Sequence, residues 1–211
     1  ACMGIGAKIF NQSPGTFGEV NAFSMHPLKS LNVMGDGGMV VTNNKKIYKW
    51  MQMYRNHGMI NRDENDIWGL NMRIQPLQAI VAMKQLKNLN KIIKKRNLNA
   101  IYFDKELSNL YPLIITPKRP KGYTETFALY MCLAEKRDKL LNYLIKKGIE
   151  CKIHYPIPLH LQKASLDMGL NKQELPVAED QAKKLITLPV HQFLNKGQLE
   201  YTVKCIKEFY F

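Results

Sequence analysis

We predict an α/β protein from this sequence, because strand-like and helix-like segments alternate along it. Short strand-like runs flank turn-forming residues before residue 44. Apolar side chains with helical spacing follow at 45 to 55 and again from residue 76. After about residue 108 the pattern becomes strand, helix, strand, which is typical of a small α/β domain. The 211 residues are enough for one large domain or two small ones.

The first 44 residues predict strands joined by turns. Residues 5 to 23 form short strands around a turn at 12 to 15, where glutamine, serine, proline and glycine follow one another. A strand is expected at 20 to 24 and another at 39 to 42, with a glycine-rich turn at 35 to 38 between them. The sequence therefore places Lys29 and the glycine-rich turn between two predicted strands.

Two helices are predicted in the middle of the chain. The first covers about 45 to 55, because Ile47, Trp50, Met51 and Tyr54 share one face. A polar loop at 58 to 74 follows. A long helix then starts at about Pro76 and runs on to about residue 107, and we allow a break near Asn97. This helix would connect the two parts of the chain.

The second part of the chain, from 108 to 211, predicts a small domain of its own. Strands are expected at 113 to 116 and 126 to 134, a helix at 138 to 147 that Gly148 ends, and a further strand at 149 to 154. The last helices cover about 176 to 185 and 196 to 209. We therefore predict domains at 1–107 and 108–211.

The net charge of +14 would suit a nucleic-acid partner, but its distribution argues against one. Residues 1 to 44 are neutral overall. Much of the excess lies on one side of the long helix, whose other side is apolar. The basic residues there are Lys84, Lys87, Lys91, Lys94, Lys95 and Arg96. Because aromatic interleaving and a recognition module are absent, we interpret this as a solvated helix face and expect no nucleic acid.

The four cysteines, Cys2, Cys132, Cys151 and Cys205, are widely spaced and include no CxxC pair. Free thiols in a reducing cytoplasm are the simplest interpretation, and we expect no metal site. The longest apolar runs are too short to span a bilayer, and residues 1 to 20 lack the pattern of a signal peptide. We therefore expect a cytoplasmic protein that does not enter the membrane.

Lys29 is the candidate catalytic residue. It follows a predicted strand and Pro27, and the glycine turn comes after it. A lysine becomes a nucleophile when its ammonium loses a proton, which burial promotes. The hydroxyl of Ser24 could hold an anion nearby. This arrangement suits a Schiff-base lysine for an aldehyde cofactor that carries a phosphate, but the residue types alone favour an ordinary surface lysine.

Several motifs in order along the whole chain resemble one family of enzymes. They are FSMHPLKSL with GDGGMVVT, then RNHG, GLNMRIQPLQA, KRNLNAIYFDKEL, IHYPIPLHLQ and LPVAEDQAKKLITLPVH. The first two resemble the active-site segment of the DegT/DnrJ/EryC1/StrS aminotransferases. These enzymes use pyridoxal 5'-phosphate to aminate keto sugars. The resemblance implies a fold type I aminotransferase, with the C-terminal part of the large mixed-sheet domain at 1–107 and the small α/β domain at 108–211.

The resemblance also implies roles for individual residues. Lys29 would hold the cofactor as a Schiff base and then shuttle a proton, and Ser24 would bind the phosphate. The family completes each site across a homodimer interface, where Asn71 or Arg73 of one subunit would reach the partner's phosphate. Met3 stands where the family often has a glutamine that contacts the cofactor.

Four histidines are candidate substrate contacts. The resemblance places His26 and His57 near the site. His154 and His160 could reach the substrate from the small domain, and a packed structural histidine is an equally good interpretation of each.

The resemblance leaves part of the family's site outside this chain. The aspartate that pairs with the cofactor's ring nitrogen would precede Ala1, and family members are about twice as long. We therefore expect these 211 residues alone not to be a competent aminotransferase.

Three classes of function remain open. The first is a sugar aminotransferase, with glutamate as the usual amino donor. HPLKSLNVMGDGG with INRDE resembles the branch that forms 8-amino-3,8-dideoxy-octulosonate for lipopolysaccharide, and other members aminate nucleotide-linked 3-keto or 4-keto hexoses. The second is a related dehydratase, which would carry histidine in place of Lys29. The third is a non-catalytic regulator, against which the presence of Lys29 and Ser24 argues.

Overall fold

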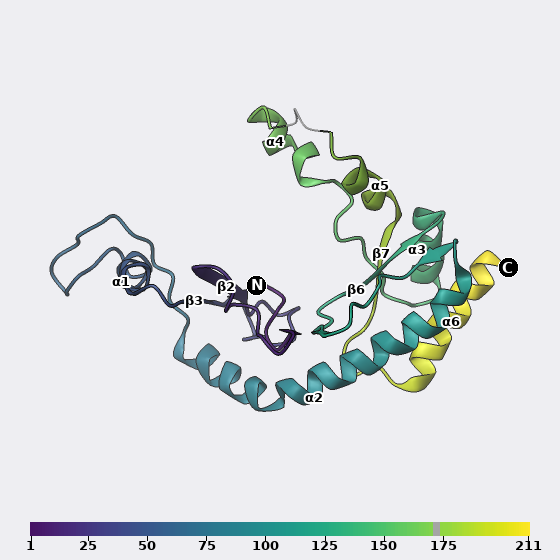
Figure 1. Cartoon of the computed structure of the whole chain (residues 1–211), viewed down its shortest axis with the longest axis horizontal. Helices are drawn as coiled ribbons and strands as arrows, with labels where there is room; N and C mark the ends of the chain where they lie inside the picture. Colours follow the sequence, from purple (N-terminus) through teal and green to yellow (C-terminus); the bar gives the residue numbers. More distant parts are fainter. Residues whose placement is uncertain (171–173) are drawn as a thin grey trace. The chain divides into compact units, whose positions relative to one another are not determined.

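The computed structural model describes residues 1–170 and 174–211, and these divide into two compact units (Figure 1). Unit 1 comprises Ala1–Lys95 and Pro120–Ala128. Unit 2 comprises Arg96–Arg119 and Leu129–Phe211. The domain boundary at 107/108 stays a prediction, and each unit is described below by itself.

Two antiparallel strands form the centre of unit 1. β2 (Val20–Ser24) pairs with β3 (Gly38–Thr42) along their whole length, and Ser24 lies opposite Gly38. The strands predicted at 20 to 24 and 39 to 42 are thus confirmed. A second, two-residue pairing joins β1 (Lys8–Ile9) to β5 (Tyr123–Thr124), which brings residues 120 to 128 into unit 1.

α1 (Lys45–Tyr54) follows β3, as predicted. The side chain of Asn44 accepts hydrogen bonds from the backbone N–H groups of Lys46 and Ile47, which satisfies two donors at the helix start. Trp50 and Tyr54 stack with ring centroids 4.6 Å apart. The segment from 55 to 75 contains neither a helix nor a strand, in agreement with the predicted polar loop.

α2 (Pro76–Leu107) is one continuous helix, so the break allowed near Asn97 does not occur. Asn97 and its neighbours tolerate the helix because tertiary contacts outweigh their modest helix propensity. Asn99 donates its side-chain amide to the carbonyl oxygens of Val190 and His191. In the C-terminal half of the helix, Ala100, Phe103 and Leu107 are buried.

Unit 2 contains a three-stranded antiparallel sheet in the order β4-β6-β7. The strands are β4 (Ile114–Ile115), β6 (Tyr130–Ala134) and β7 (Leu185–Leu188). The longer helices of the unit are α3 (Arg137–Lys146), α5 (Pro176–Lys184) and α6 (Lys196–Tyr210), and α3 contacts β6, β7 and α6. Short helical turns complete it: η1 (Ser108–Leu110), η2 (Leu159–Leu161) and α4 (Lys163–Asp167).

Two predicted elements of unit 2 are corrected. The strand expected at 126 to 134 begins only at Tyr130. The segment 149 to 154 is not a strand and pairs only at one bridge, between Lys152 and Thr187. The helix expected at about 176 to 185 is confirmed as α5, which ends at Lys184, and β7 follows at once. β7 lacks the alternation of a half-exposed strand because Ile186, Thr187 and Leu188 are all buried.

The described residues offer no sign of a membrane span or a metal centre. No helix among them is both long and apolar enough to cross a bilayer. No group of three or more histidine, cysteine, aspartate or glutamate side chains is arranged to hold a metal ion in this part of the chain. All four cysteines are unpaired thiols, and three of them are buried.

Candidate active site

Lys29 lies in the connection between β2 and β3, and we call residues 25 to 37 the Lys29 loop. The loop closes on itself at its base. The backbone N–H of Met25 donates to the carbonyl of Gly37 at 2.7 Å, and that of Val33 donates to the carbonyl of Met25 at 3.1 Å. Both ends of the loop are therefore fixed by the strand pair from which it emerges.

Within the loop, a tight turn carries the candidate residues. The N–H of Lys29 donates to the carbonyl of His26 at 2.9 Å. The N–H of His26 in turn donates to the hydroxyl of Ser24 at 3.3 Å. These bonds hold the backbone of Ser24, His26 and Lys29 together. Lys29 is half-buried.

His26 is exposed on this turn and has two contacts. Its Nδ1 accepts the N–H of Leu28 at 3.2 Å, so Nε2 carries the proton when the ring is neutral. Nε2 lies 3.9 Å from the Asp36 carboxylate, whose side chain is almost fully exposed. The pair spans the two sides of the Lys29 loop at its surface.

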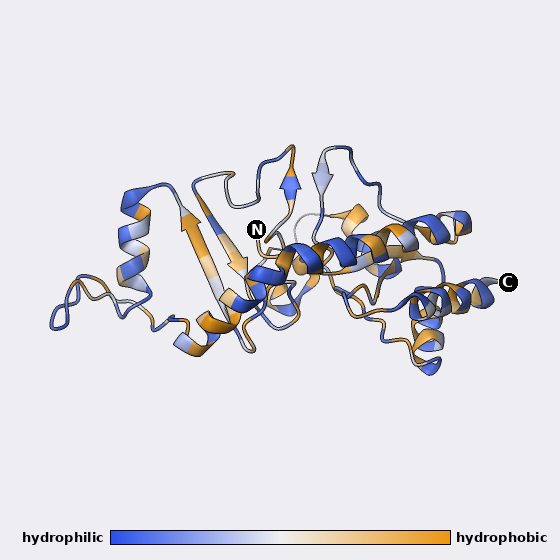
Figure 2. Cartoon of the chain, turned by 90° about the horizontal axis from the view of Figure 1, so that it is seen from below, coloured by the Kyte–Doolittle hydropathy of each residue, from blue (hydrophilic) through white to orange (hydrophobic). Residues whose placement is uncertain are grey.

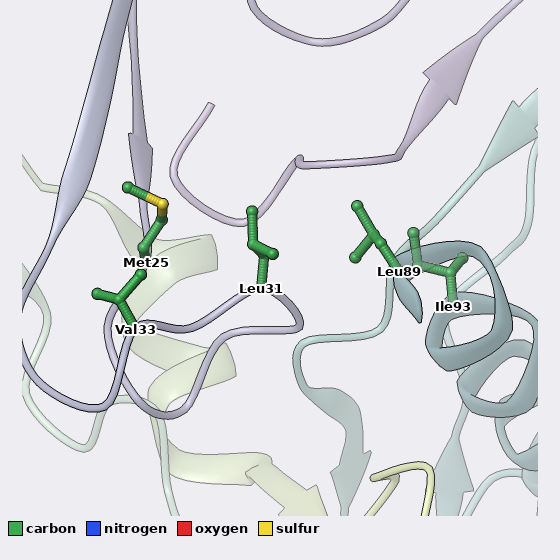
Figure 3. Close-up of a cluster of buried hydrophobic side chains, with 5 residues drawn as sticks. All are labelled: Met25, Leu31, Val33, Leu89 and Ile93. Atoms are coloured by element: carbon green, nitrogen blue, oxygen red, sulfur yellow. The ribbon is translucent and has the colours of Figure 1, made fainter. Parts of the chain in front are cut away.

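The inner side of the Lys29 loop is apolar and packs on α2. Figure 3 shows Met25, Leu31 and Val33 from the loop with Leu89 and Ile93 from the helix. All five side chains are buried, with at most 7% of their surface exposed. Burying side chains of this size contributes roughly 1.5 to 3 kcal/mol each. The packing therefore holds the loop on a rigid helix.

Gln78 adds a polar connection between the loop and the start of α2. Its Oε1 accepts the backbone N–H of Gln75 at 3.1 Å, which caps the helix. Its Nε2 donates to the carbonyl of Asp36 at 2.9 Å. A Cβ on Gly35 would lie 3.2 Å from that Nε2, so the small residue permits the close approach. One side chain thus joins the helix start to the loop.

Residues 54 to 57 and 70 to 73 lie side by side, which brings two of the motifs together. The N–H of His57 donates to the carbonyl of Leu70 at 3.0 Å, and the N–H of Met72 donates to the carbonyl of Arg55 at 2.9 Å. His57 has a positive φ of 62°, in the left-handed region. This pairing orders the polar loop that follows α1.

The predicted phosphate donors Asn71 and Arg73 contact each other. Arg73 donates through Nε to Asn71 Oδ1 at 2.9 Å and through Nη1 to Asn56 Oδ1 at 2.8 Å. Asn71 and Arg73 are both exposed. The structure gives Arg73 no hydrogen bond to Ser24 or Lys29 within the described residues. Their role in phosphate binding stays a prediction.

The first residues of the chain lie beside the base of the Lys29 loop. The N–H of Ser24 donates to the carbonyl of Cys2 at 3.2 Å. The carbonyl of Met3 accepts the Thr126 hydroxyl at 2.7 Å, and the Met3 side chain is 43% exposed. The predicted cofactor contact through Met3 is not tested by these bonds.

A second candidate site is a pocket of about 680 Å³ that lies wholly within unit 2. Its apolar walls come from η2, from α5 and from the segments beside them. They include Ile157, Pro158, Leu159, Leu175, Ala178 and Leu185. His154, His160, Gln162 and Gln181 add polar atoms. The pocket has the volume and the mainly apolar lining that are typical of small-molecule sites.

The structure places both predicted histidines of the small domain at this pocket. His160 is nearly buried, and its Nε2 lies 3.1 Å from Oε1 of Glu179. The hydrogen bond from His160 lowers the pKa of the Glu179 carboxyl, and a second bond from the N–H of Leu175 adds to this effect. His154 Nδ1 contacts the Thr187 hydroxyl at 2.9 Å. Both rings are thus held by neighbours and line the pocket.

His191 is not among the described residues that line this pocket. Partial burial lowers the pKa of its imidazole, and the charge of Arg96 adds to the shift. Arg96 is buried and donates to the side chain of Gln192 at 3.0 Å. These contacts agree with a structural role.

Comparison with known proteins identifies the family. The model of the DegT/DnrJ/EryC1/StrS aminotransferase family matches residues 1–207. The chain belongs to this family. It is 33% identical over 211 residues to the pleiotropic regulatory protein of Geobacillus stearothermophilus, covering all of this chain and 57% of that one. It is 32% identical over 195 residues to the UDP-N-acetyl-3-dehydro-α-D-glucosamine 3-aminotransferase of Acidithiobacillus ferrooxidans, covering 92% of this chain and 52% of that one.

Solved structures of family members share the fold. A DegT/DnrJ/EryC1/StrS aminotransferase from Brucella abortus superimposes with a TM-score of 0.91 at 30% identity, covering 99% of this chain and 56% of that chain. DesV from S. venezuelae superimposes with a TM-score of 0.93, also at 30% identity and with the same coverage. The predicted fold, part of a fold type I aminotransferase, is confirmed. The chain spans about half the length of the relatives it matches.

Two residues of the family motifs have structural roles that sequence reasoning missed. Gln78 lies inside the GLNMRIQPLQA segment and Asn56 inside RNHG, so both were part of the resemblance. Their contacts join residues far apart in sequence, such as Gln78 and Asp36. Helical or strand periodicity does not report such contacts, which is why the motifs alone did not single these residues out.

Proposed function

We propose that this chain carries the catalytic lysine of a pyridoxal-phosphate-dependent aminotransferase that aminates a keto sugar. The observation that carries the proposal is the Lys29 loop. It holds a half-buried lysine in a tight turn with Ser24 and is packed on α2. The membership of the DegT/DnrJ/EryC1/StrS family supports it, since that family is named for aminotransferases.

Lys29 in the loop and Ser24 at the end of β2 fit two ends of the cofactor. Lys29 supplies an amine for an aldehyde carbon, and Ser24 supplies a hydroxyl for a phosphate. The adjacent Ser30 has a buried hydroxyl without a hydrogen-bond partner among the described residues, which is uncommon for a buried polar atom. The donor set therefore suits a phosphate-bearing aldehyde.

The proposed chemistry assigns one task to each of these side chains. Bound pyridoxal phosphate supplies an electron sink for the carbon that loses or gains a proton. Lys29 Nζ takes that proton and returns it, as a positioned general base and acid. Ser24 Oγ donates a hydrogen bond to a phosphate oxygen and so fixes the distance to Lys29. We expect glutamate to supply the amino group.

We further propose that the complete site forms in a homodimer of the whole protein. Asn71 or Arg73 of one subunit would contact the phosphate held by its partner, and His26 and His57 would lie close to the substrate. The exposure of Asn71 and Arg73 supports such a role. The chain covers about half the length of its relatives, so we expect the 211 residues alone not to form the complete site.

The substrate is proposed as a keto sugar linked to a nucleotide. The names of several relatives specify such sugars, among them a dTDP-3-amino-3,4,6-trideoxy-α-D-glucose transaminase of Streptomyces venezuelae at 30% identity. The A. ferrooxidans relative acts on a UDP-linked sugar by its name. The finer prediction from sequence, formation of 8-amino-3,8-dideoxy-octulosonate, stays a second possibility for the same reaction. Either product would serve cell-surface polysaccharide synthesis.

The test is a borohydride trap on the protein with its upstream half restored. The protein is incubated with pyridoxal phosphate, reduced, digested and analysed by mass spectrometry. We expect the pyridoxyl group on the peptide that contains Lys29, and we expect Lys29→Ala to abolish it. Lys45→Ala, a change to an exposed lysine on α1, is the matched control and should leave the adduct in place. A folded dimer without an adduct at Lys29 would refute the aminotransferase proposal.

A regulatory role is the second candidate. Two relatives carry regulatory names, the pleiotropic regulatory protein at 33% identity and the erythromycin biosynthesis sensory transduction protein EryC1 of Saccharopolyspora erythraea at 30%. The trap separates the two functions, because a regulator without cofactor chemistry would form no adduct at Lys29. With an adduct, amination of keto sugars would be assayed next.

A further inference from the structure

The outer side of α2 carries a row of lysines to which the proposed function gives no task. They are Lys84, Lys87, Lys91, Lys94 and Lys95, and we call them the lysine face. All five belong to unit 1. We propose that the lysine face binds an acidic helix of a partner protein. This inference goes beyond the proposed function and does not rest on it.

The lysine face points away from the core of unit 1. Because successive helical residues are about 100° apart around the axis, Lys87 lies about 160° from Leu89, and Lys91 lies about 160° from Ile93. Leu89 and Ile93 are buried under the Lys29 loop. Four of the lysines are exposed, and Lys95 is partly exposed. A partner bound here would therefore leave the side of the helix that holds the Lys29 loop untouched.

No acidic side chain balances the lysine face within the described residues. The sequence has no aspartate or glutamate between Asp66 and Asp104, and none of the five lysines forms an ion pair in this part of the structure. Unit 2 shows how helical lysines of this chain can be balanced by an acid four residues away. The pairs there are Lys163–Asp167, Asp180–Lys184, Lys196–Glu200 and Lys204–Glu208.

The lysines also repel one another along the helix. Lys87 and Lys91 are four residues apart, as are Lys91 and Lys95, so their side chains are neighbours on the helix surface. Like charges at this spacing destabilise a helix. Carboxylates placed over the row would remove this repulsion and attract each ammonium group. Binding of an acidic partner would therefore stabilise α2 itself.

The shape of the lysine face favours a helix as the partner. It is about 17 Å long, at 1.5 Å per residue, and only one helix wide. From Lys84 to Lys94 the spacing is three, four and three residues. A helix lying alongside can present glutamates at the same spacing, as the flanking charges of paired helices do.

Other anionic partners fit the lysine face less well. Helices that lie on membranes have exposed apolar residues beside the basic ones, and between Lys84 and Lys95 only Leu86 is a large exposed apolar residue. Nucleic-acid sites add aromatic side chains for stacking, and no aromatic residue lies in that range. A second copy would bring mainly like charge, because the chain has 31 basic and 17 acidic residues.

The test is a fluorescence-anisotropy titration of the 211-residue protein with two labelled, alanine-based helical peptides. Both contain four glutamates and have the same composition. In the matched peptide the glutamates are spaced by three, four and three residues, and in the scattered peptide they are spread around the helix. We expect the matched peptide to bind at least about tenfold more tightly at low ionic strength, and salt to weaken its binding because exposed charges are screened. Equal binding of the two peptides would overturn the proposal.

Matched pairs of variants locate the site. Lys87→Gln with Lys91→Gln removes two charges from the lysine face, and Lys45→Gln with Lys49→Gln removes two exposed charges of the same spacing from α1. We expect the first pair to weaken binding of the matched peptide at least about tenfold and the second pair to change it little, with thermal unfolding confirming that both variants fold. Equal weakening would mean that binding follows the net charge alone, which would overturn the assignment.

Three further arms test the other occupants. A short DNA duplex, or vesicles that contain phosphatidylglycerol, binding the lysine face as tightly as the matched peptide would overturn the choice of an acidic helix. The titration is repeated on the protein with its upstream half restored, where we expect the same affinity. Binding lost there would show that the longer protein covers the lysine face itself, and this would also overturn the proposal.

Discussion

Lys29 takes its position from main-chain hydrogen bonds around it. The N–H of Lys29 is held by the carbonyl of His26, and the N–H of His26 is held by Ser24 Oγ. The side chain of Lys29 is therefore carried by a fixed backbone. When the backbone of a nucleophile is already fixed, the nucleophile loses little conformational entropy as it reacts. This is the general advantage of preorganised catalytic groups.

The cysteines differ sharply in environment, and this predicts their reactivity. Burial raises the pKa of the Cys132 thiol to about 12, and it raises that of Cys151 to about 12 as well. Cys2 is exposed. Because the thiolate is the reactive form, we expect iodoacetamide at pH 8 to label Cys2 rapidly in the folded protein and to spare Cys132 and Cys151.

The labelling is followed by peptide mass spectrometry, and the matched control is the same reaction in denaturant. There all four thiols should be labelled at comparable rates. Rapid labelling of Cys132 or Cys151 without denaturant would show that β6 or the segment before Lys152 opens more readily than the structure indicates.

At the scale of elements, a substitution at Gln78 tests how the Lys29 loop is stabilised. Gln78→Glu keeps an acceptor for the N–H of Gln75 but replaces the donor to the Asp36 carbonyl with a carboxylate. The lost bond is worth about 1 kcal/mol. We therefore expect the amide of Met25, at the base of the loop, to exchange with deuterium several-fold faster while α2 stays capped.

Hydrogen-exchange NMR measures this, with Gln52→Glu as the control. Gln52 lies on α1, where its amide contacts the Tyr48 hydroxyl at an exposed position, and the substitution changes the net charge equally. An unchanged exchange rate at Met25 in Gln78→Glu would mean that the apolar packing on Leu89 and Ile93 suffices to hold the loop.

The elements also show which parts of the fold the sequence could predict. β2, β3 and α1 follow turn residues and clear periodicities, and the sequence placed each within a residue or so. The sequence did not predict β7. Its residues are mostly buried, so apolar and polar residues do not alternate along it, and the sequence does not separate it from the preceding helix. The segment 149 to 154 shows alternating burial at Ile149 and Cys151, yet it finds a partner only at Lys152. Pairing depends on neighbours that a local pattern does not reveal.

The candidate site also has features that the sequence could predict and features that it could not. Ser24 and Lys29 are five positions apart, so both the residues and the family motif pointed to them together. The attachment of their loop to Leu89 and Ile93 and the contact of Gln78 with Asp36 are long-range, and only the structure revealed them. The pocket in unit 2 joins residues from 154 to 185 and was likewise visible only after folding.

At the scale of the whole molecule, unit 1 exposes much apolar surface. Met39 and Val40 are neighbours on β3 and therefore point to opposite faces, yet each is about half exposed. Leu77, Ile80 and Met83 follow one another at three-residue spacing on α2 and are more than 60% exposed. Figure 2 shows the hydrophobic colouring along both strands and over the first turns of the helix. Surfaces of this kind are usually covered by another protein segment.

We expect the 211-residue chain to self-associate through this surface at micromolar to millimolar concentrations. The triple variant Leu77→Gln, Ile80→Gln, Met83→Gln should shift the sedimentation profile toward the monomer, because it removes the apolar stripe from α2 without touching a buried residue. Sedimentation velocity over a concentration series is the measurement.

A triple variant in unit 2 is the control for the loss of apolar side chains in general. Ile145, Leu166 and Val177 are each at least 45% exposed, and replacing them with glutamine should change the association little. Association that persists in the α2 variant, or that disappears in the control, would show that other surfaces hold the copies together.

The closure of the Lys29 loop has a consequence for the order of folding. Its ends meet where Ser24 pairs with Gly38, so the chain between them is short, and the entropy lost on joining them is small. A strand pair of this kind forms within microseconds once its turn is made. The backbone around the catalytic candidate can thus assemble early, before α2 has been synthesised. The loop would pack on Leu89 and Ile93 later, and this packing would stabilise a backbone conformation that has already formed.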